Sequence, residues 1–278
     1  MKKELIYIGL TVVMAGTLFS CKKAALTETN PNVLNQDELN MIAAAGFNSN
    51  WAEKSGTGNY LIEGDIYLSK DQLTKMAGAE TKHNFIVADE EHYRTYNVVS
   101  TPTGSRVITV SMSIGFPSYY YTALDKALAR YNSYGLKITF QKVETGGNIV
   151  VTGTNLGTSG GGCILGQASG FPDASGNPSK GFTLSTSSCA TTYLNTEAKA
   201  DEVIAHEIGH CIGFRHTDYK RRNSCGPGAG ESAGSIGAVH ILGTPTNVSG
   251  SYDSWMMACT NGSAAFNGDD GIALNYVY

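Results

Sequence analysis

Residues 206–216 read HEIGHCIGFRH, and this stretch contains three of the six histidines in the chain. On a helix, His206 and His210 lie about one turn apart, so both imidazoles leave the same face and can bind one metal ion. Glu207 is too close in sequence to His206 to bend back as a further ligand, but it can take a proton from the water that attacks a substrate. We therefore predict that His206 and His210 are metal ligands and that Glu207 is the general base.

The third histidine of the stretch, His216, can reach the same ion only if the helix ends before it. A continuing helix would carry His216 roughly 9 Å beyond His210 along the axis. Gly213 can end the helix, because a residue without a Cβ atom adopts the left-handed conformation that reverses the chain. Three neutral imidazoles leave one position of Zn²⁺ open, as in catalytic zinc sites. The sequence therefore predicts one catalytic Zn²⁺ ion bound by His206, His210 and His216.

A helix with incidental histidines would explain a lone HExxH pattern, which is short. It does not explain a glycine and a third histidine at the places that a three-histidine site requires. The full stretch is therefore strong support for a metal site.

Composition sets the class of protein. The chain has 278 residues, of which 41% are hydrophobic and 16% charged, enough for one large domain or a domain with a small addition. Its net charge of −4 gives no basic surface for nucleic acid or anionic lipid. We expect a monomer that does not bind nucleic acid.

The first residues resemble an export signal. Lys2 and Lys3 precede an apolar stretch, residues 5–19, that is too short and too early for a membrane span of the mature protein. We expect residues 1–20 to be a signal peptide and the mature protein to be secreted.

Cys21 allows three interpretations. Residues 18–21 read LFSC, which resembles a bacterial lipobox, so Cys21 could anchor a lipoprotein to a membrane. Alternatively, the Cys21 thiolate could occupy the open zinc position of a zymogen and leave when the leader is cut. The third interpretation is an ordinary signal-peptide cysteine that is lost on processing.

Export would also permit disulfides among the other five cysteines. We favour a Cys163–Cys189 bond, which would close a turn-rich loop. The second choice is Cys225–Cys259 with Cys211 as a buried free thiol, and a Cys211–Cys225 bond is a close alternative.

After the expected signal peptide, the chain divides into three segments. We interpret residues 21–36 as a leader or pro-segment, residues 37–95 as an N-terminal extension, and residues 96–278 as the zinc metallopeptidase domain. His83 and His92 are expected to be solvated. Within the extension, the sequence predicts a short helix at 37–47, an extended element at 59–69 and a helix plus linker at 70–95.

An α/β pattern follows the extension. A strand, a helix and two further strands in this order imply a right-handed crossover and a largely parallel sheet. The helix with the histidines should begin near Asn195 or Thr196, either of which can cap it. The predicted strands are residues 106–113, 136–144, 148–156, an irregular edge strand at 158–172 and a fifth strand at 181–187, with a helix at 117–135 after the first strand.

Three further segments carry a family resemblance: GAVHILGTP at 237–245, DSWMMAC at 253–259 and FNGDDGIALNYVY at 266–278. Together with HEIGHCIGFRH, they resemble the metzincin zinc endopeptidases. The HEIGH residues and these segments also resemble the bacterial HEIGH-type metallopeptidases, which include myroilysin-like elastases near the astacins. The resemblance covers roughly residues 100–278.

The resemblance implies an α/β (α+β) metzincin-type fold. This fold would have a twisted five-stranded mixed sheet, two long helices and a smaller C-terminal subdomain below the cleft. It also implies the zinc ligands and base named above, with Met256 as the methionine of the turn beneath the zinc and Met257 as its alternative. Asp270 would cap the final helix. A substrate would pair with the edge strand near Gly166–Phe171.

The chain departs from the astacins at two places. Thr217 stands where astacins have a glutamate that pairs with the mature N-terminus, and Asp218 is one residue later. Ala258 stands where a tyrosine lies near the zinc, and Tyr252 is a speculative substitute. His240 could line the cleft, although a packed loop histidine is the more ordinary interpretation.

The leading hypothesis is a secreted zinc-dependent endopeptidase that acts on proteins or peptides. An alternative is a metal-dependent amidase that acts on cell-wall peptides. A second alternative is a non-catalytic surface adhesion module that keeps a metal ion for stability. A structural metal site of this kind does not need a base such as Glu207. Elastase-like relatives hint at structural or nutrient proteins as substrates.

Overall fold

The computed structural model describes residues 33–55, 58–78, 92–226, 230–245, 253–260, 262 and 265–278. All of them belong to one compact unit, residues 32–278. Cys21, His83 and Tyr252 lie outside the described residues. Within the described part, no helix combines the length and apolar character that a membrane span needs.

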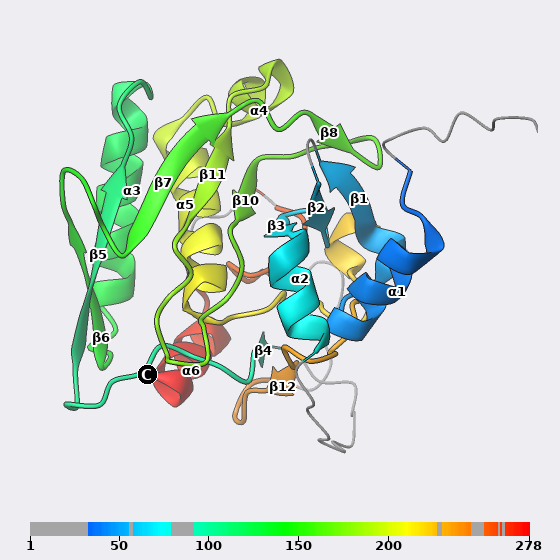
Figure 1. Ribbon diagram of the computed structural model, residues 1–278. Coiled ribbons are helices and arrows are strands. Elements are labelled where there is room, and N and C mark those ends of the chain that lie inside the picture. The colour runs from blue at the N-terminus through cyan, green and yellow to red at the C-terminus, as the bar shows by residue number, and fades with distance from the viewer. Residues whose placement is uncertain are drawn as a thin grey trace, which may run out of the picture. The chain divides into compact units, whose positions relative to one another are not determined.

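One eight-stranded sheet runs through this unit (Figure 1). In spatial order its strands are β1 (Ala52–Ser55), β2 (Asn59–Ile62), β3 (Ile66–Ser69), β10 (Gly166–Ala168), β11 (Gly181–Ser185), β7 (Ile149–Thr154), β5 (Arg106–Met112) and β6 (Ile138–Lys142). Two small antiparallel pairs lie outside it: β4 (Tyr93–Arg94) with β12 (Val239–His240), and β8 (Thr158–Ser159) with β9 (Gly162–Cys163).

All five strands predicted from the sequence are present, as β5, β6, β7, β10 and β11. The pairs β5/β6, β5/β7 and β7/β11 are parallel, which confirms the largely parallel sheet. In β5, Ile108, Val110 and Met112 are buried, while Val107, which points to the other face, is 54% exposed, as expected for a strand with one face on a core.

The prediction of only five strands is wrong, because the N-terminal extension adds three more. Strands β1, β2 and β3 form an antiparallel meander, and β3 pairs in parallel with β10 at Ile66 and Ala168. Strand β10 therefore lies between β3 and β11 instead of at an edge. The expected free edge for a substrate at residues 166–171 is occupied in this chain.

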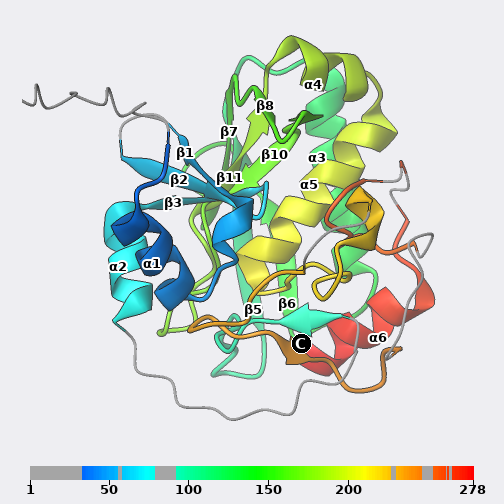
Figure 2. The ribbon, with the colours of Figure 1, turned by 90° about the vertical axis from the view of Figure 1, so that its right-hand side faces the viewer.

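Six α-helices are described. Helices α1 and α2 lie together beside β1–β3, whereas α3 and α5 pack against each other on one face of the sheet (Figure 2). The helices are α1 (Gln36–Ala45), α2 (Lys70–Ala77), α3 (Ser118–Asn132), α4 (Ser188–Tyr193), α5 (Glu197–Ile212) and α6 (Gly268–Val277), with single 3₁₀ turns at Ser49–Trp51 and Asn223–Cys225.

The extension has a small core of its own. Its buried side chains come from α1, α2, β2 and β3 and include Ile42, Tyr60, Ile62 and Leu73. The larger core lies between the other five strands and helices α3, α5 and α6. The described part of the extension is therefore a folded segment with its own hydrophobic core.

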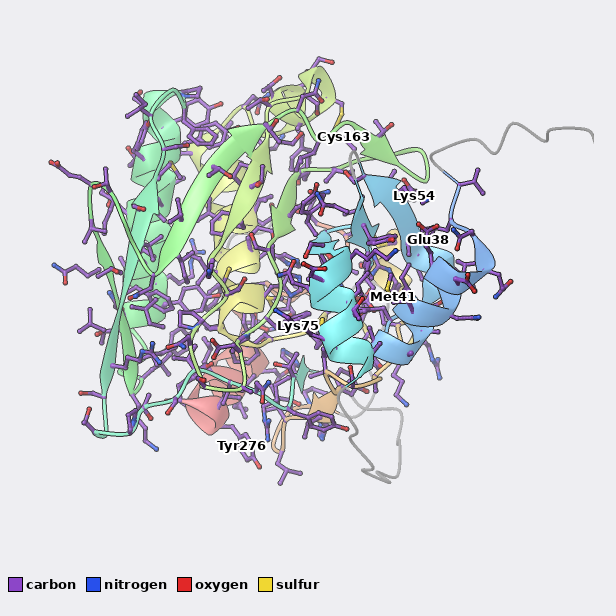
Figure 3. All side chains as sticks on the ribbon, viewed as in Figure 1. Glu38, Met41, Lys54, Lys75, Cys163 and Tyr276 are labelled. Atoms are coloured by element: carbon purple, nitrogen blue, oxygen red, sulfur yellow. A yellow bond between two sulfur atoms is a disulfide. The ribbon has the colours of Figure 1, made fainter. Side chains whose placement is uncertain are left out.

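Polar contacts also join α1 to the meander. Lys54 on β1 lies 3.0 Å from a carboxylate oxygen of Glu38 on α1, and both side chains are visible on that flank in Figure 3. The Tyr60 hydroxyl donates to the other Glu38 oxygen at 3.2 Å.

Helix α5 begins and ends where the sequence predicts. The Thr196 side chain accepts a hydrogen bond from the backbone of Lys199, so Thr196 is the N-cap. Gly213 follows the last helical residue with φ of 109°, in the left-handed region. The Tyr131 hydroxyl of α3 donates to the Ala205 carbonyl at 2.7 Å, which fixes α5 against α3.

Both favoured disulfides, Cys163–Cys189 and Cys225–Cys259, are present. Cys211 is the buried free cysteine among those described. Its position on α5 excludes the alternative Cys211–Cys225 bond in this structure.

Candidate metal centre

Three histidine side chains meet at the end of α5. The helix places His206 and His210 one turn apart, and the reversal at Gly213 brings His216 back to them. The Nε2 atoms of His206, His210 and His216 lie 3.2, 3.3 and 2.6 Å from one carboxylate oxygen, Oδ2 of Asp65. The four side chains thus point at a common centre, although Asp65 is 141 residues before His206.

The other nitrogen of each ring has a partner on the opposite side. Such a partner fixes the ring orientation and leaves Nε2 for a metal. Each Nδ1–H can donate to its acceptor: the Trp255 carbonyl at 2.9 Å for His206, the Phe214 carbonyl at 2.9 Å for His210, and a Glu231 carboxylate oxygen for His216.

This set of donors fits a zinc ion. Asp65, His206, His210 and His216 each offer one ligand atom, and these atoms lie within 4.8 Å of one another. Three imidazole nitrogens with one carboxylate oxygen are common zinc donors. The structure thus brings the three predicted ligands together and places Asp65 beside them as a fourth candidate.

The electrostatics of the centre favour positive charge. Burial alone would lower the pKa of His216, but the carboxylates of Asp65 and Glu231 outweigh it and raise that pKa to about 10. Burial would raise the pKa of Asp65, yet His216 and His210 hold it well below its usual range. The carboxylates around the rings would therefore stabilise a cation.

Glu207 is buried beside the ligands, with 2% of its surface exposed. Burial, and then the nearby charge of Asp65, raises the pKa of the Glu207 carboxyl well above its usual value. Its Oε2 atom has no hydrogen-bond partner among the described residues. Gly166 on β10 leaves room for it, because a Cβ atom there would lie 2.4 Å from Glu207 Oε1. A raised pKa makes the Glu207 carboxylate a stronger base, and its unpartnered Oε2 is available to accept a proton.

Asp65 was not predicted from the sequence as part of the site. It follows Glu63 and Gly64 in the turn between β2 and β3, and both of these residues have positive φ, 55° and 89°. This tight turn, and the parallel pairing of β3 with β10, project Asp65 into the histidines. The sequence signal was a charged Glu-Gly-Asp turn between two apolar strands.

A buried ion-pair network holds this turn against the histidine stretch. The Arg215 side chain is fully buried, and its Nη2 lies 2.8–2.9 Å from both carboxylate oxygens of Glu63. The same atom donates to Glu231 at 3.2 Å, and Arg222 donates to Glu231 at 2.7 Å. Because Glu231 also contacts His216, the network joins the extension to one candidate ligand.

Met256, the predicted turn methionine, packs against the helix that carries His206 and His210. A Cβ atom on Gly209 of α5 would lie 2.3 Å from the Met256 sulfur, so the two residues pack in direct contact. The Met256 carbonyl also accepts from the Thr217 amide at 2.7 Å. Met257, the alternative, lines a neighbouring cleft.

That cleft has a volume of about 600 Å³ and lies beside Asp65. Gly166, His206 and Glu207 are part of its wall, whereas Phe171 is not. Phe171 instead packs edge-on against His210, with 5.6 Å between the ring centres.

His92 is not solvated, contrary to the prediction. It is 2% exposed, and its Nε2 lies 2.8 Å from Asp270 Oδ1. Asp270 is also the third residue of a capping box with Asn267, so it caps α6 as expected. Its carboxylate further accepts from the Ser254 hydroxyl at 2.6 Å, beside the methionine turn. The local sequence around His92 does not indicate the contact with Asp270, because Asp270 is 178 residues away.

His240 is a half-buried histidine of a short strand, and it packs against neighbouring residues. It belongs to β12, which pairs with β4, and its Nε2 lies 3.1 Å from the Thr244 hydroxyl. It is not among the residues that line the cleft.

Comparisons with known proteins complete the description. A family model described as "Dual-action HEIGH metallo-peptidase" matches residues 60–278. No curated protein matches the chain. Two solved structures of myroilysin align with 21% and 18% identity, over 42% and 68% of this chain and 46% and 90% of theirs, with TM-scores of 0.28 and 0.34. High choriolytic enzyme 1, a hatching enzyme zinc-protease from the medaka fish Oryzias latipes, aligns with 20% identity over 44% of this chain and 48% of its own, with a TM-score of 0.26. The chain thus spans about half the length of the first myroilysin structure and of the hatching enzyme.

Proposed function

Because the chain belongs to the HEIGH metallopeptidase family, as its motif predicted, we propose that it is a secreted zinc endopeptidase that its own N-terminal extension keeps inactive. One observation carries this proposal: a single oxygen of Asp65 lies within 3.3 Å of Nε2 on all three histidines. The place that a substrate and its attacking water need is therefore taken by the chain itself.

The geometry supports a catalytic role for each of these residues. His206, His210 and His216 would hold the zinc ion through Nε2, and their Nδ1 partners would keep the rings in place. When bound, Zn²⁺ supplies Lewis-acid chemistry that polarises the scissile carbonyl and makes water more acidic. Glu207 takes the proton of the attacking water at its unpartnered Oε2 and gives it to the leaving amine.

The extension blocks the site in two ways. Asp65 supplies the fourth ligand, in place of the Cys21 thiolate considered from the sequence. Strand β3 covers β10 through the Ile66–Ala168 pairing, so a peptide cannot add to that strand. A cut between α2 and β4, followed by release of the extension, would free β10 to pair with an extended substrate near Gly166–Phe171.

Export is supported by the chain itself. Two disulfides in the described part suit an oxidising compartment, and the first 20 residues have the composition of a signal peptide. Acylation at Cys21 would make the protein a membrane-anchored lipoprotein instead. N-terminal sequencing and intact mass of the exported protein distinguish the two.

The test compares four purified proteins: the intact chain, the chain after removal of the extension by limited proteolysis, Asp65→Ala, and Glu207→Gln. We expect one zinc ion per chain in each and casein hydrolysis only in the cut chain and, more weakly, in Asp65→Ala. Full activity of Glu207→Gln after cutting would refute the assignment of the base. An intact chain as active as the cut chain would refute self-inhibition.

A further inference from the structure

Glu202 is a buried acidic residue in the wall of the cleft. It precedes His206 by four residues on α5, so the two side chains leave the same face of the helix, with roughly 6 Å between their Cβ atoms. Only 6% of its surface is exposed, and it lines the 600 Å³ cleft together with His206 and Glu207. Neither the proposed zinc ligands nor the proposed base require this carboxylate.

The two oxygens of Glu202 have different surroundings. Oε1 accepts hydrogen bonds from the Thr260 hydroxyl and, at 3.1 Å, from the Gly262 amide, which fix the carboxylate in position. Oε2 has no partner among the described residues. A buried carboxylate oxygen without a donor costs stability, so such an atom calls for a function. At the wall of a substrate cleft, the missing donor can come from the substrate.

The wall around Glu202 is largely apolar. Val203, Ile164, Leu165 and Trp255 contribute to it, together with the Cys225–Cys259 disulfide. A side chain with a long hydrocarbon stem and a cationic tip suits such a wall, because the stem contacts apolar groups while the tip reaches the carboxylate.

The charges of the cleft also favour a cationic side chain. Four carboxylates line it, and Arg222 is the single lysine or arginine among its described lining residues. Arg222 already donates to Glu231 at 2.7 Å. Two of the four carboxylates, Glu53 and Asp65, belong to the extension and would leave with it. Glu202 and Glu207 would then remain, and Glu202 is the one that no proposed catalytic step uses.

We propose that Glu202 determines specificity, by accepting a hydrogen bond at Oε2 from a lysine or arginine side chain of the substrate close to the scissile bond. This inference rests on the proposed endopeptidase function and adds its substrate class: proteins and peptides with a basic residue at the cleavage site. Burial raises the pKa of the Glu202 carboxyl above its usual value, although the hydrogen bonds from Thr260 and Gly262 offset part of this rise. A bound cation would favour the ionised form further.

Glu202→Gln is the informative variant, because glutamine keeps the side-chain volume and an oxygen acceptor for Thr260 and Gly262 but removes the charge. Glu144→Gln makes the same chemical change at an exposed position after β6, outside the cleft lining, and is the matched control. Melting temperatures of both variants verify that they are folded.

The first measurement uses cut chains and a peptide library in which lysine at each position near the scissile bond is compared with norleucine. The original chain and Glu144→Gln should favour lysine or arginine at one position. Glu202→Gln should reduce the lysine-to-norleucine ratio of kcat/KM by about 10- to 100-fold, while cleavage of norleucine peptides persists. Cleavage without any basic preference, or an unchanged ratio in Glu202→Gln, would overturn the inference but leave the proposed function in place.

The second measurement does not depend on catalysis. Agmatine, a small guanidinium compound, is titrated into the intact chain and both variants by calorimetry. Binding should weaken about tenfold in Glu202→Gln relative to Glu144→Gln. Equal binding to the two variants, or no binding to the intact chain, would count against the role of Glu202. This outcome is independent of catalysis, whereas a failure to cleave any library peptide would refute the proposed endopeptidase function.

Discussion

Arg215 binds Glu63 through a guanidinium nitrogen that lies 2.9 and 2.8 Å from the two carboxylate oxygens, and both side chains are fully shielded from solvent. This ion pair joins the histidine stretch to the turn that presents Asp65. Its partners are 152 residues apart in sequence.

Replacing Glu63 by Ala should loosen the extension. Removing one partner of a buried ion pair costs about 3–5 kcal/mol, and Glu231 would recover part of this because it also contacts Arg215. We expect a lower melting temperature and measurable peptide hydrolysis by the intact chain. A variant that melts like the original chain and stays inactive would show that this pair does not hold the extension in place.

Gly166→Ala should impair catalysis without loss of metal. The added Cβ would lie 2.4 Å from Glu207 Oε1, so the carboxylate must move. A displacement of about 1 Å can reduce the rate by roughly 100-fold, and we expect a fall of this order in kcat/KM of the cut chain. Zinc content should not change. Gly268→Ala, where an added Cβ meets no atom within 4 Å, is the control and should retain full activity.

Removal of the metal should abolish activity and lower stability. A ligand that binds only the folded state adds about 2.7 kcal/mol at 100 times its Kd, so the melting temperature should fall on chelation and recover with Zn²⁺. The intact chain should lose zinc more slowly than the cut chain, because the proposed fourth ligand, Asp65, is present only in the intact chain. Equal rates of loss, followed with a coloured chelator, would contradict a role for Asp65 as ligand.

Met256→Ala should destabilise the floor of the site. Met256 is 1% exposed and touches Gly209 on the histidine helix, so truncation leaves a cavity that costs about 2–5 kcal/mol. Met256→Leu keeps the volume and should cost less than about 1.5 kcal/mol. Chemical denaturation of the two variants measures the difference. Similar values would indicate that the side chain is not tightly packed.

The Cys163–Cys189 disulfide should contribute about 3–4 kcal/mol, as expected for cysteines 26 residues apart. Replacing both cysteines by serine should lower the free energy of unfolding by this amount. Because Cys163 also lines the cleft, kcat/KM should be measured alongside. A stability change below 1 kcal/mol would mean that the unfolded chain gains little freedom when this bond is absent.

The local features of this protein could be predicted from the sequence. Thr196 and Gly213 bound α5 because capping depends on residues within one turn of the helix end. The spacing of His206, His210 and His216 then determines their convergence. Strands β5, β6, β7 and β11 could also be predicted, because each alternates or is apolar over its own length.

Long-range pairing could not be predicted. Nothing in residues 52–69 indicates that β3 will join β10, since one register pair, Ile66 with Ala168, makes the connection. The location of Asp65 depends on that pairing. The burial of His92 could not be predicted either, because it depends on a contact with Asp270, 178 residues later in the chain. Such contacts arise from the assembled fold and leave no pattern in the segment itself.

The tether between the meander and the histidine helix has a kinetic consequence. In the proposed inhibited state, the turn that carries Asp65 competes with substrates as part of the same chain, at an effective concentration roughly in the millimolar range. A single backbone cut ends that advantage but breaks none of the contacts of Asp65 or β3. The nicked protein should therefore show a lag before it works at full rate, and dilution or a second cut inside the severed fragment should shorten that lag.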